Sequence, residues 1–355
     1  MRCVSTSAVS FPLSYFSVTQ RGVILKAVFD FGIHDSRIVE VFYNDNLQPV
    51  VVPPNCVIDL STIRSFYRNR FTAIPNFLSL IKKQGKLSFY LQRTFALGDM
   101  LMLVPVIRYL RTLGYDPWIR TTDLFTKILD YLGVFVEMVE HPHHLEGHGI
   151  SLDGVIERDH RDKALSHIHR VYIYLKALGL EKMPKELDWS YDLSRFPEPE
   201  VGDEPYVVLQ DGGSTHKKRL AEGSDYMRDR LERQGVRVIS IGALFKKQKK
   251  STLHLFSLIA KAKCLITMDS GPLWISHFTK TPIVAIFGPT RPEERLFLHP
   301  LYPEGTIAIE LSKEVDCEPC FEQAIKCNDK IACLGISKER ISELVEPEVM
   351  RFWKE

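Results

Sequence analysis

Several features are scarce in this sequence, and each absence excludes a class of protein. No run of about 18 apolar residues occurs, so no membrane-spanning helix is predicted. Charge is nearly balanced, with 46 basic and 44 acidic residues and a formal net charge of +2, which argues against a general binder of nucleic acids or other polyanions. No strand is followed by a G-x-G-x-x-G turn, so a nicotinamide-dependent oxidoreductase is disfavoured. The N-terminal stretch MRCVSTSAVSFPLSYF has one basic residue and no convincing cleavage site, and no signal peptide is predicted.

Cysteine is sparse until the C-terminal region, where it clusters. Four of the seven cysteines follow the pattern C-x2-C-x6-C-x5-C, at Cys317, Cys320, Cys327 and Cys333. Four thiolates so close together predict a tetrahedral, closed metal site of structural type, with zinc as the default metal. The alternative is a set of reduced cysteines without metal. Cys3, Cys56 and Cys264 are scattered and predicted to be buried fillers. This usage fits a reducing compartment, and we expect a cytoplasmic protein.

Alternating strand and helix patterns from Lys86 onward predict two successive α/β domains with parallel sheets. The Pro- and acid-rich segment 192–206 marks the boundary between them. The basic-aromatic segment 62–85 is favoured as a linker helix over a docking surface for an acidic partner or another subunit. The predicted domains are a β-rich N-terminal domain over 1–61, the helical linker over 62–85, α/β domains over 86–195 and 196–345, the second with a four-cysteine insertion over 317–333, and a C-terminal helix over 346–355.

The stretch LITMDSGPLWISHFTKTPIVAIFGPT, residues 265–290, carries the clearest ligand-binding pattern. An apolar strand breaks at Asp269-Ser270-Gly271-Pro272, and a helix and a second buried strand follow. Such βαβ units bind ligands at the carboxyl ends of their strands. Gly271 can adopt backbone angles that other residues avoid, and Pro272 suits the first helical position. The start of the helix is therefore a candidate phosphate site, and Asp269 suits a sugar hydroxyl. The alternative is an ordinary turn in which Asp269 and Ser270 only cap the helix.

Two further stretches belong with this one: LGDMLMLVPVIRYL, with Gly98-Asp99 between a strand and a helix, and the loop DGGSTHKKR over 211–219. In this order and spacing the three resemble glycosyltransferase family 9, the ADP-heptose:lipopolysaccharide heptosyltransferases and their relatives, over about 86–345. The resemblance implies a GT-B fold, with two Rossmann-like domains facing across a cleft. It also implies an acceptor on the first domain, a nucleotide-diphosphate-sugar donor on the second, and inverting transfer without a catalytic metal.

The resemblance also implies roles for individual residues. Asp99 matches the proposed general base, which takes the proton of the acceptor hydroxyl. Its alternative role is to cap the following helix. Lys218 and Ser214 match positions that hold the diphosphate, where positive charge stabilises the leaving group. The predicted donor-binding residues are Gly212, Gly213, Ser214, Lys218, Asp269, Ser270 and Gly271. The predicted acceptor-side residues are Gly98, Asp153 and His160, the last two chosen for their polarity and their place between two αβ segments.

Two positions depart from the family pattern. The family usually has a histidine five residues after the aspartate, where this chain has Trp274. Where relatives often place an acidic residue near the nucleotide ribose, this chain has Ala243-Leu244. Both departures leave the sugar and nucleotide open, with ADP-heptose favoured. They also support an alternative, a GT-B-fold scaffold or nucleotide-sugar-binding protein without turnover.

The cysteine cluster adds a more specific comparison. It is similar to an iron-binding finger in the family's autotransporter heptosyltransferases, which also carry an extra N-terminal domain, so iron is the rival to zinc. The acceptor is a lipopolysaccharide core, another glycan or a protein hydroxyl. Assembly into a homo-oligomer is left open.

Overall fold

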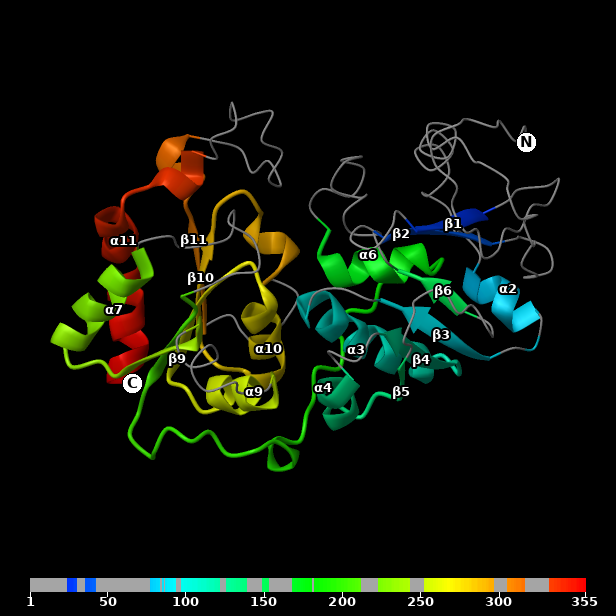
Figure 1. Ribbon diagram of the computed structural model, residues 1–355, viewed down its shortest axis with the longest axis horizontal. Helices are drawn as coiled ribbons and strands as arrows, with labels where there is room; N and C mark the ends of the chain where they lie inside the picture. The colour runs from blue at the N-terminus through cyan, green and yellow to red at the C-terminus, as the bar shows by residue number, and fades with distance from the viewer. Residues whose placement is uncertain are drawn as a thin grey trace.

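The structure is a computed structural model with two lobes, each built around a parallel sheet (Figure 1). It describes residues 24–30, 36–42, 77–83, 85, 87–93, 97–121, 126–138, 149–152, 168–180, 182–211, 223–242, 252–296, 305–316 and 332–355. The two sheets lie within the segments 86–195 and 196–345, and they confirm the α/β fold predicted from the alternating pattern.

The first lobe has a four-stranded sheet in the order β5-β4-β3-β6, in which all neighbours are parallel. Its strands are β3 (Ser88–Gln92), β4 (Asp116–Thr121), β5 (Val136–Met138) and β6 (Gly149–Ser151). Its helices are α2 (Phe77–Lys83), α3 (Leu97–Thr112), α4 (Thr126–Tyr131) and α6 (Arg170–Ala177). Strand β6 was not predicted, because three residues beside a histidine-rich stretch give no apolar pattern.

The second lobe has a five-stranded parallel sheet in the order β11-β10-β9-β7-β8. Its strands are β7 (Val207–Leu209), β8 (Val238–Ser240), β9 (Cys264–Met268), β10 (Ile283–Phe287) and β11 (Thr306–Glu310). Helices α9 (Thr252–Ala260) and α10 (Gly271–Thr279) cover the face toward the first lobe, and α7 (Gly223–Arg233) and α11 (Lys338–Lys354) cover the outer face (Figure 1). Every residue of β9 and β10 is buried, as expected for central strands covered on both sides.

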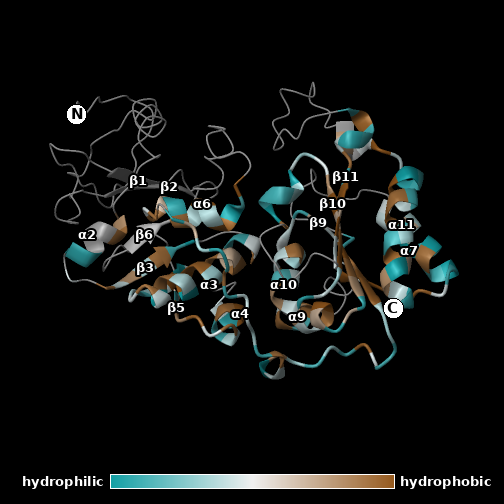
Figure 2. Cartoon of the chain, turned by 180° about the vertical axis from the view of Figure 1, so that it is seen from behind, coloured by the Kyte–Doolittle hydropathy of each residue, from teal (hydrophilic) through white to brown (hydrophobic). Residues whose placement is uncertain are grey.

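The apolar core is divided by the second sheet. One cluster packs α7 and α11 against the outer face of that sheet. The other runs from the first lobe through α3 to α9 and α10 on the inner face, so a single apolar cluster joins the two lobes. Figure 2 shows apolar strands within the second lobe and hydrophilic residues on α7 and α11. Because burial of apolar surface is the main stabilising term in folding, this shared cluster fixes how α3 and α10 meet.

Helix α11 corrects one predicted boundary. The predicted C-terminal helix over 346–355 is the second half of a helix that begins at Lys338 and passes through Pro347. The Ser337 side chain caps its start by accepting a hydrogen bond from the backbone N–H of Arg340 at 3.2 Å. The apolar stripe of the helix, including Ile341, Val345 and Val349, is buried against the sheet.

The remaining described parts are the boundary segment and a short N-terminal pair of strands. The predicted boundary segment 192–206 holds one 3₁₀ turn, Leu193–Arg195, and runs between the lobes (Figure 1). Strands β1 (Ile24–Asp30) and β2 (Ser36–Phe42) pair antiparallel within the predicted β-rich segment 1–61, whose other residues lie outside the described ranges. Among the helices that the structure describes, none is both long enough and apolar enough to cross a membrane.

Candidate functional site at the junction of the lobes

The two predicted motif turns lie on helices that pack against each other across the junction. Helix α3 follows β3 and starts with Leu97-Gly98-Asp99, and α10 follows β9 and starts after Asp269-Ser270. The contact is reciprocal, because each helix presents a glycine. A Cβ on Gly98 would lie 2.4 Å from Cδ1 of Trp274, and a Cβ on Gly271 would lie 3.2 Å from Cδ2 of Leu97.

This contact changes the role expected of Gly271. The sequence predicted a glycine with unusual backbone angles, but Gly271 is the first residue of α10 and is not among the described glycines with positive φ. What the position uses is the missing side chain, which allows Leu97 to approach. Pro272 stands in the first turn, as predicted from its missing N–H.

Asp99 lies in the first turn of α3 with 9% of its surface exposed, and it is paired with a buried arginine. Nη2 of Arg93, the residue after β3, donates a hydrogen bond to Oδ2 of Asp99. Nη1 of Arg93 also donates to the carbonyl of Leu152 at 3.4 Å. Asp99 is the third residue of the helix and not its N-cap, so the capping alternative for this residue is wrong. The arginine favours the ionised form of the carboxyl group.

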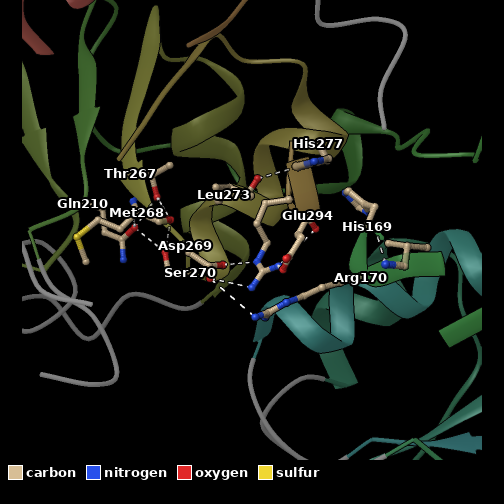
Figure 3. Close-up of polar contacts among 12 residues, drawn as sticks. His169, Arg170, Gln210, Thr267, Met268, Asp269, Ser270, Leu273, His277 and Glu294 are labelled. Atoms are coloured by element: carbon tan, nitrogen blue, oxygen red, sulfur yellow. Dashed lines mark hydrogen bonds and ion pairs between the residues drawn. The ribbon is translucent and has the colours of Figure 1, made fainter. Parts of the chain in front are cut away.

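Asp269 lies at the carboxyl end of β9 with 5% exposure, and an arginine from the same lobe holds both of its oxygens. Nε and Nη2 of Arg295 donate to Oδ1 and Oδ2 at 2.8 and 3.0 Å. From the first lobe, Nη2 of Arg170 at the start of α6 lies 3.9 Å from Oδ2 (Figure 3). The D-S-G aspartate is therefore surrounded by guanidinium groups from both lobes.

Ser270 occupies the N-cap position of α10 but makes no side-chain capping hydrogen bond. Its hydroxyl instead donates to Oε1 of Gln210 at 2.6 Å, an oxygen that also accepts from Thr267 and from the backbone N–H of Met268 (Figure 3). Gln210 follows β7, so this bond ties the turn to the neighbouring strand. The alternative in which Ser270 only caps the helix is wrong.

Glu294 was not predicted, and it is the most deeply buried carboxyl group at the junction among the described residues, with 2% exposure. It ends the 3₁₀ turn Pro292–Glu294 after β10, and its Oε2 accepts from Nη1 of Arg295 at 3.1 Å. Its Oε1 is buried without a hydrogen-bond partner. Burial raises the pKa of Glu294 to about 8, opposed by Arg170 and reinforced by Asp269. In the sequence, the indication that Glu294 belongs to the site was its place after the end of a strand.

Aromatic and histidine rings fill the junction beside these charges. Trp274 is buried and lies stacked 5.1 Å from His277. It approaches His169 at 5.5 Å and Trp189, just before the boundary segment, at 6.5 Å between ring centroids. Burial, with His277 and Arg170 nearby, lowers the pKa of His169 well below its ordinary value, and its Nδ1 accepts from the backbone N–H of Val171 at 3.3 Å. Trp274, the departure from the family pattern, thus packs directly on the turn that carries Asp99.

The other predicted residues are placed as follows. Asp211, before the predicted phosphate loop, accepts a hydrogen bond from the backbone N–H of Gly242. Cys264 is buried in β9, as predicted, and Cys333 is buried in the outer apolar cluster. Within the described ranges no three His, Cys, Asp or Glu residues are grouped to hold a metal ion. The predictions that fall outside those ranges concern Gly212, Gly213, Ser214, Lys218, Asp153, His160, Cys3, Cys56, Cys317, Cys320 and Cys327.

Comparison with a model of glycosyltransferase family 9 (heptosyltransferase) finds a match over residues 248–330. That segment contains the D-S-G turn, Trp274 and Glu294, and it confirms the resemblance drawn from the sequence over this part of the chain. It does not extend to Asp99 or to the loop 212–218. No match was found among curated proteins.

Several solved structures resemble the chain at low identity. The iron-containing dodecameric glycosyltransferase TibC from enterotoxigenic E. coli is 16% identical with a TM-score of 0.45, and the match covers 62% of each chain. A family 9 glycosyltransferase from Veillonella parvula is 18% identical with a TM-score of 0.49, covering 74% of this chain and 97% of that one. E. coli heptosyltransferase WaaC with ADP is 13% identical with a TM-score of 0.46, covering 73% and 99%. The chain thus spans less than two thirds of TibC.

Proposed function

We propose that this chain, whose segment 248–330 matches glycosyltransferase family 9, is an inverting glycosyltransferase with a GT-B arrangement of its two lobes. It would transfer a heptose or related sugar from a nucleotide-diphosphate donor, with ADP-heptose favoured, to a hydroxyl of a glycan, a lipopolysaccharide core or a protein, in the cytoplasm. The observation that carries the proposal is the direct packing of α3 on α10, which brings the Asp99 turn of one lobe to the D-S-G turn of the other.

The chemistry follows from this placement. The acceptor oxygen attacks the anomeric carbon as the bond from that carbon to the diphosphate oxygen breaks, and Asp99 takes the acceptor proton. Arg93 holds the Asp99 carboxylate from the side of the protein interior. Negative charge grows on the leaving diphosphate, where the backbone N–H groups at the start of α10 and the predicted Lys218 and Ser214 would stabilise it. Asp269, whose two oxygens are fixed by Arg295, is the proposed partner of a sugar hydroxyl of the donor.

A structural metal is part of the proposal. Cys317, Cys320, Cys327 and Cys333 would hold zinc or iron in a closed site, with no role in the transfer step. Cys333 is buried in the outer apolar cluster, before the start of α11. A metal bound by Cys333 would attach the four-cysteine insertion to this cluster, which supports a structural role for the metal. No catalytic metal is expected, and a homo-oligomer remains an option.

The alternative, a binding protein or scaffold without turnover, is favoured by one observation. Trp274 stands where the family usually has a histidine, and it fills the space against Gly98, one residue before the proposed base. In the enzyme hypothesis the acceptor hydroxyl must reach Asp99, and the Trp274 ring, which packs against Gly98, would limit the space for it.

The variant Asp99→Asn, compared with the wild type, distinguishes the glycosyltransferase from the scaffold without turnover. ADP release from ADP-heptose, measured with water, lipopolysaccharide core and serine- or threonine-containing peptides as acceptors, should fall about 10²- to 10⁴-fold, because a general base contributes this much. The ADP affinity of Asp99→Asn, measured by calorimetry, should equal that of the wild type. Asp188→Asn, which removes the charge of an exposed aspartate, serves as the control. If the wild-type protein binds ADP but releases no ADP from ADP-heptose with any acceptor, the scaffold hypothesis is supported. If it binds neither ADP nor ADP-heptose, both the enzyme and the scaffold hypotheses are contradicted.

A further inference from the structure

We propose that Glu294 carries a proton at neutral pH, so that the junction cluster of Arg170, Asp269, Glu294 and Arg295 holds one excess positive charge for an anionic diphosphate. This inference rests on the proposed function and extends it to pH control of ligand binding at the same turn. Asp269, Glu294 and Arg295 are buried, and Arg170 is largely buried. Arg295 contacts both carboxyl groups, and Arg170 approaches Asp269 from the first lobe (Figure 3).

The hydrogen bonds of the cluster show which carboxyl group is the weaker acceptor. Asp269 receives two hydrogen bonds from Arg295, in the bidentate geometry that stabilises an ionised carboxylate. Glu294 receives one side-chain hydrogen bond, at Oε2, while its Oε1 is buried without a partner. An ionised carboxylate is an acceptor at both oxygens, so a buried one with an unsatisfied oxygen is costly, and the neutral acid is the favoured form.

Charged groups face Glu294 from three elements. Arg291, Glu293 and Arg295 come from its own segment, Asp269 from the turn after β9, and Arg170 from α6 of the first lobe. Arg170, Arg291 and Arg295, the last through its hydrogen bond to Oε2, favour the carboxylate, and Asp269 and Glu293 oppose it. Burial is the largest effect and raises the pKa of Glu294 to about 8. Within the junction cluster, Arg170 and Arg295 each carry a positive charge and Asp269 carries a negative charge. With Glu294 neutral, the net charge of the cluster is therefore +1.

An excess positive charge has a direct consequence for ligands. A diphosphate at the start of α10 is attracted to the cluster while Glu294 is neutral. Above about pH 8, Glu294 loses its proton, the cluster becomes neutral, and the attraction weakens. Since Arg170 belongs to the first lobe, the same charge also links anion binding to the contact between the lobes.

The test is the affinity for ADP, measured by calorimetry between pH 7.5 and 9.5, a range in which phosphate groups with a second pKa of about 6 are fully ionised. Wild-type affinity should fall about tenfold over this range. Glu294→Gln, which mimics the neutral acid, should show little change. The matched control is Glu346→Gln, a buried glutamate paired with Arg230 on the outer face, which should keep the wild-type loss. Equal losses in wild type and Glu294→Gln, or a flat wild-type profile, would overturn the inference.

A second readout keeps this inference separate from the proposed function. If ADP does not bind at any pH, the donor assignment fails, and the protonation of Glu294 is then decided by stability. The melting temperatures of wild type and Glu294→Gln are measured without ligand from pH 5 to 8. The two values should be similar at low pH and differ most at pH 8, because a rise in pH lowers the melting temperature of the wild type more than that of Glu294→Gln. Parallel profiles would show that Glu294 is ionised throughout and would overturn the inference.

Discussion

Asp99 and Asp269 occupy matching places in the two lobes, since each lies where a buried strand gives way to a helix and each is paired with an arginine. Their surroundings differ. Asp99 is paired with Arg93, and 12% of its side chain is exposed; Asp269 has a bidentate partner, a second guanidinium at 3.9 Å and only 6% of its side chain exposed. The more exposed carboxylate suits proton transfer, which needs access to substrate. The fixed one suits recognition, which needs a stable orientation.

The largest expected difference between the two turns is in stability. Asp269→Asn should lower the free energy of unfolding by about 3 kcal/mol, because it leaves the fully buried Arg295 with Glu294 as its remaining carboxyl partner. Asp99→Asn should cost less, about 1–2 kcal/mol, because the carboxyl group is more exposed and Arg93 keeps its bond to Leu152. Urea unfolding of both variants measures the comparison, and a larger loss for Asp99→Asn would reverse it.

The glycines sharpen the same comparison on a smaller scale. Gly98→Ala should destabilise by about 1–3 kcal/mol, because its Cβ would lie 2.4 Å from the Trp274 ring, which is buried and fixed by its neighbours. Gly271→Ala should cost under about 1 kcal/mol, because Leu97 at 3.2 Å can shift its side chain. The double variant Gly98→Ala/Trp274→His should recover part of the loss. Thermal unfolding of the three variants would contradict this account if Gly271→Ala were the most harmful.

The effect expected from the second lobe alone is a dependence of stability on pH. Because the pKa of Glu294 is raised in the folded state, the folded protein keeps a proton that the unfolded chain releases above its ordinary pKa of 4.5. Stability from this group is complete at low pH and falls as pH rises toward about 8, by at most about 1.4 kcal/mol per pH unit. Urea unfolding of wild type and Glu294→Gln at pH 5.5, 6.5 and 7.5 measures it, and an equal slope in both would exclude Glu294 as the source.

Local patterns in the sequence predicted the elements that place these turns. The apolar runs of β9 and β10 and the breaks at Gly98-Asp99 and Asp269-Ser270 were enough to predict strand, turn and helix, because each depends on neighbouring residues. Arg295 and Arg170 were missed because their partner Asp269 lies far from them in sequence, and Arg170 belongs to the other lobe. The Gly98–Trp274 contact was missed for the same reason, and for Glu294 the sequence offered only its place after a strand end, because its burial depends on the folded structure.

The central claim is that one donor site lies between the Asp99 turn and the D-S-G turn, and a crystal structure of the protein with ADP tests it most directly. The account predicts the diphosphate at the start of α10, beside Ser270 and Gly271, with its terminal phosphate directed toward the Asp99 turn of the first lobe. ADP bound on the outer face near α7 and α11, or with its phosphates directed away from the junction of α3 and α10, would contradict it.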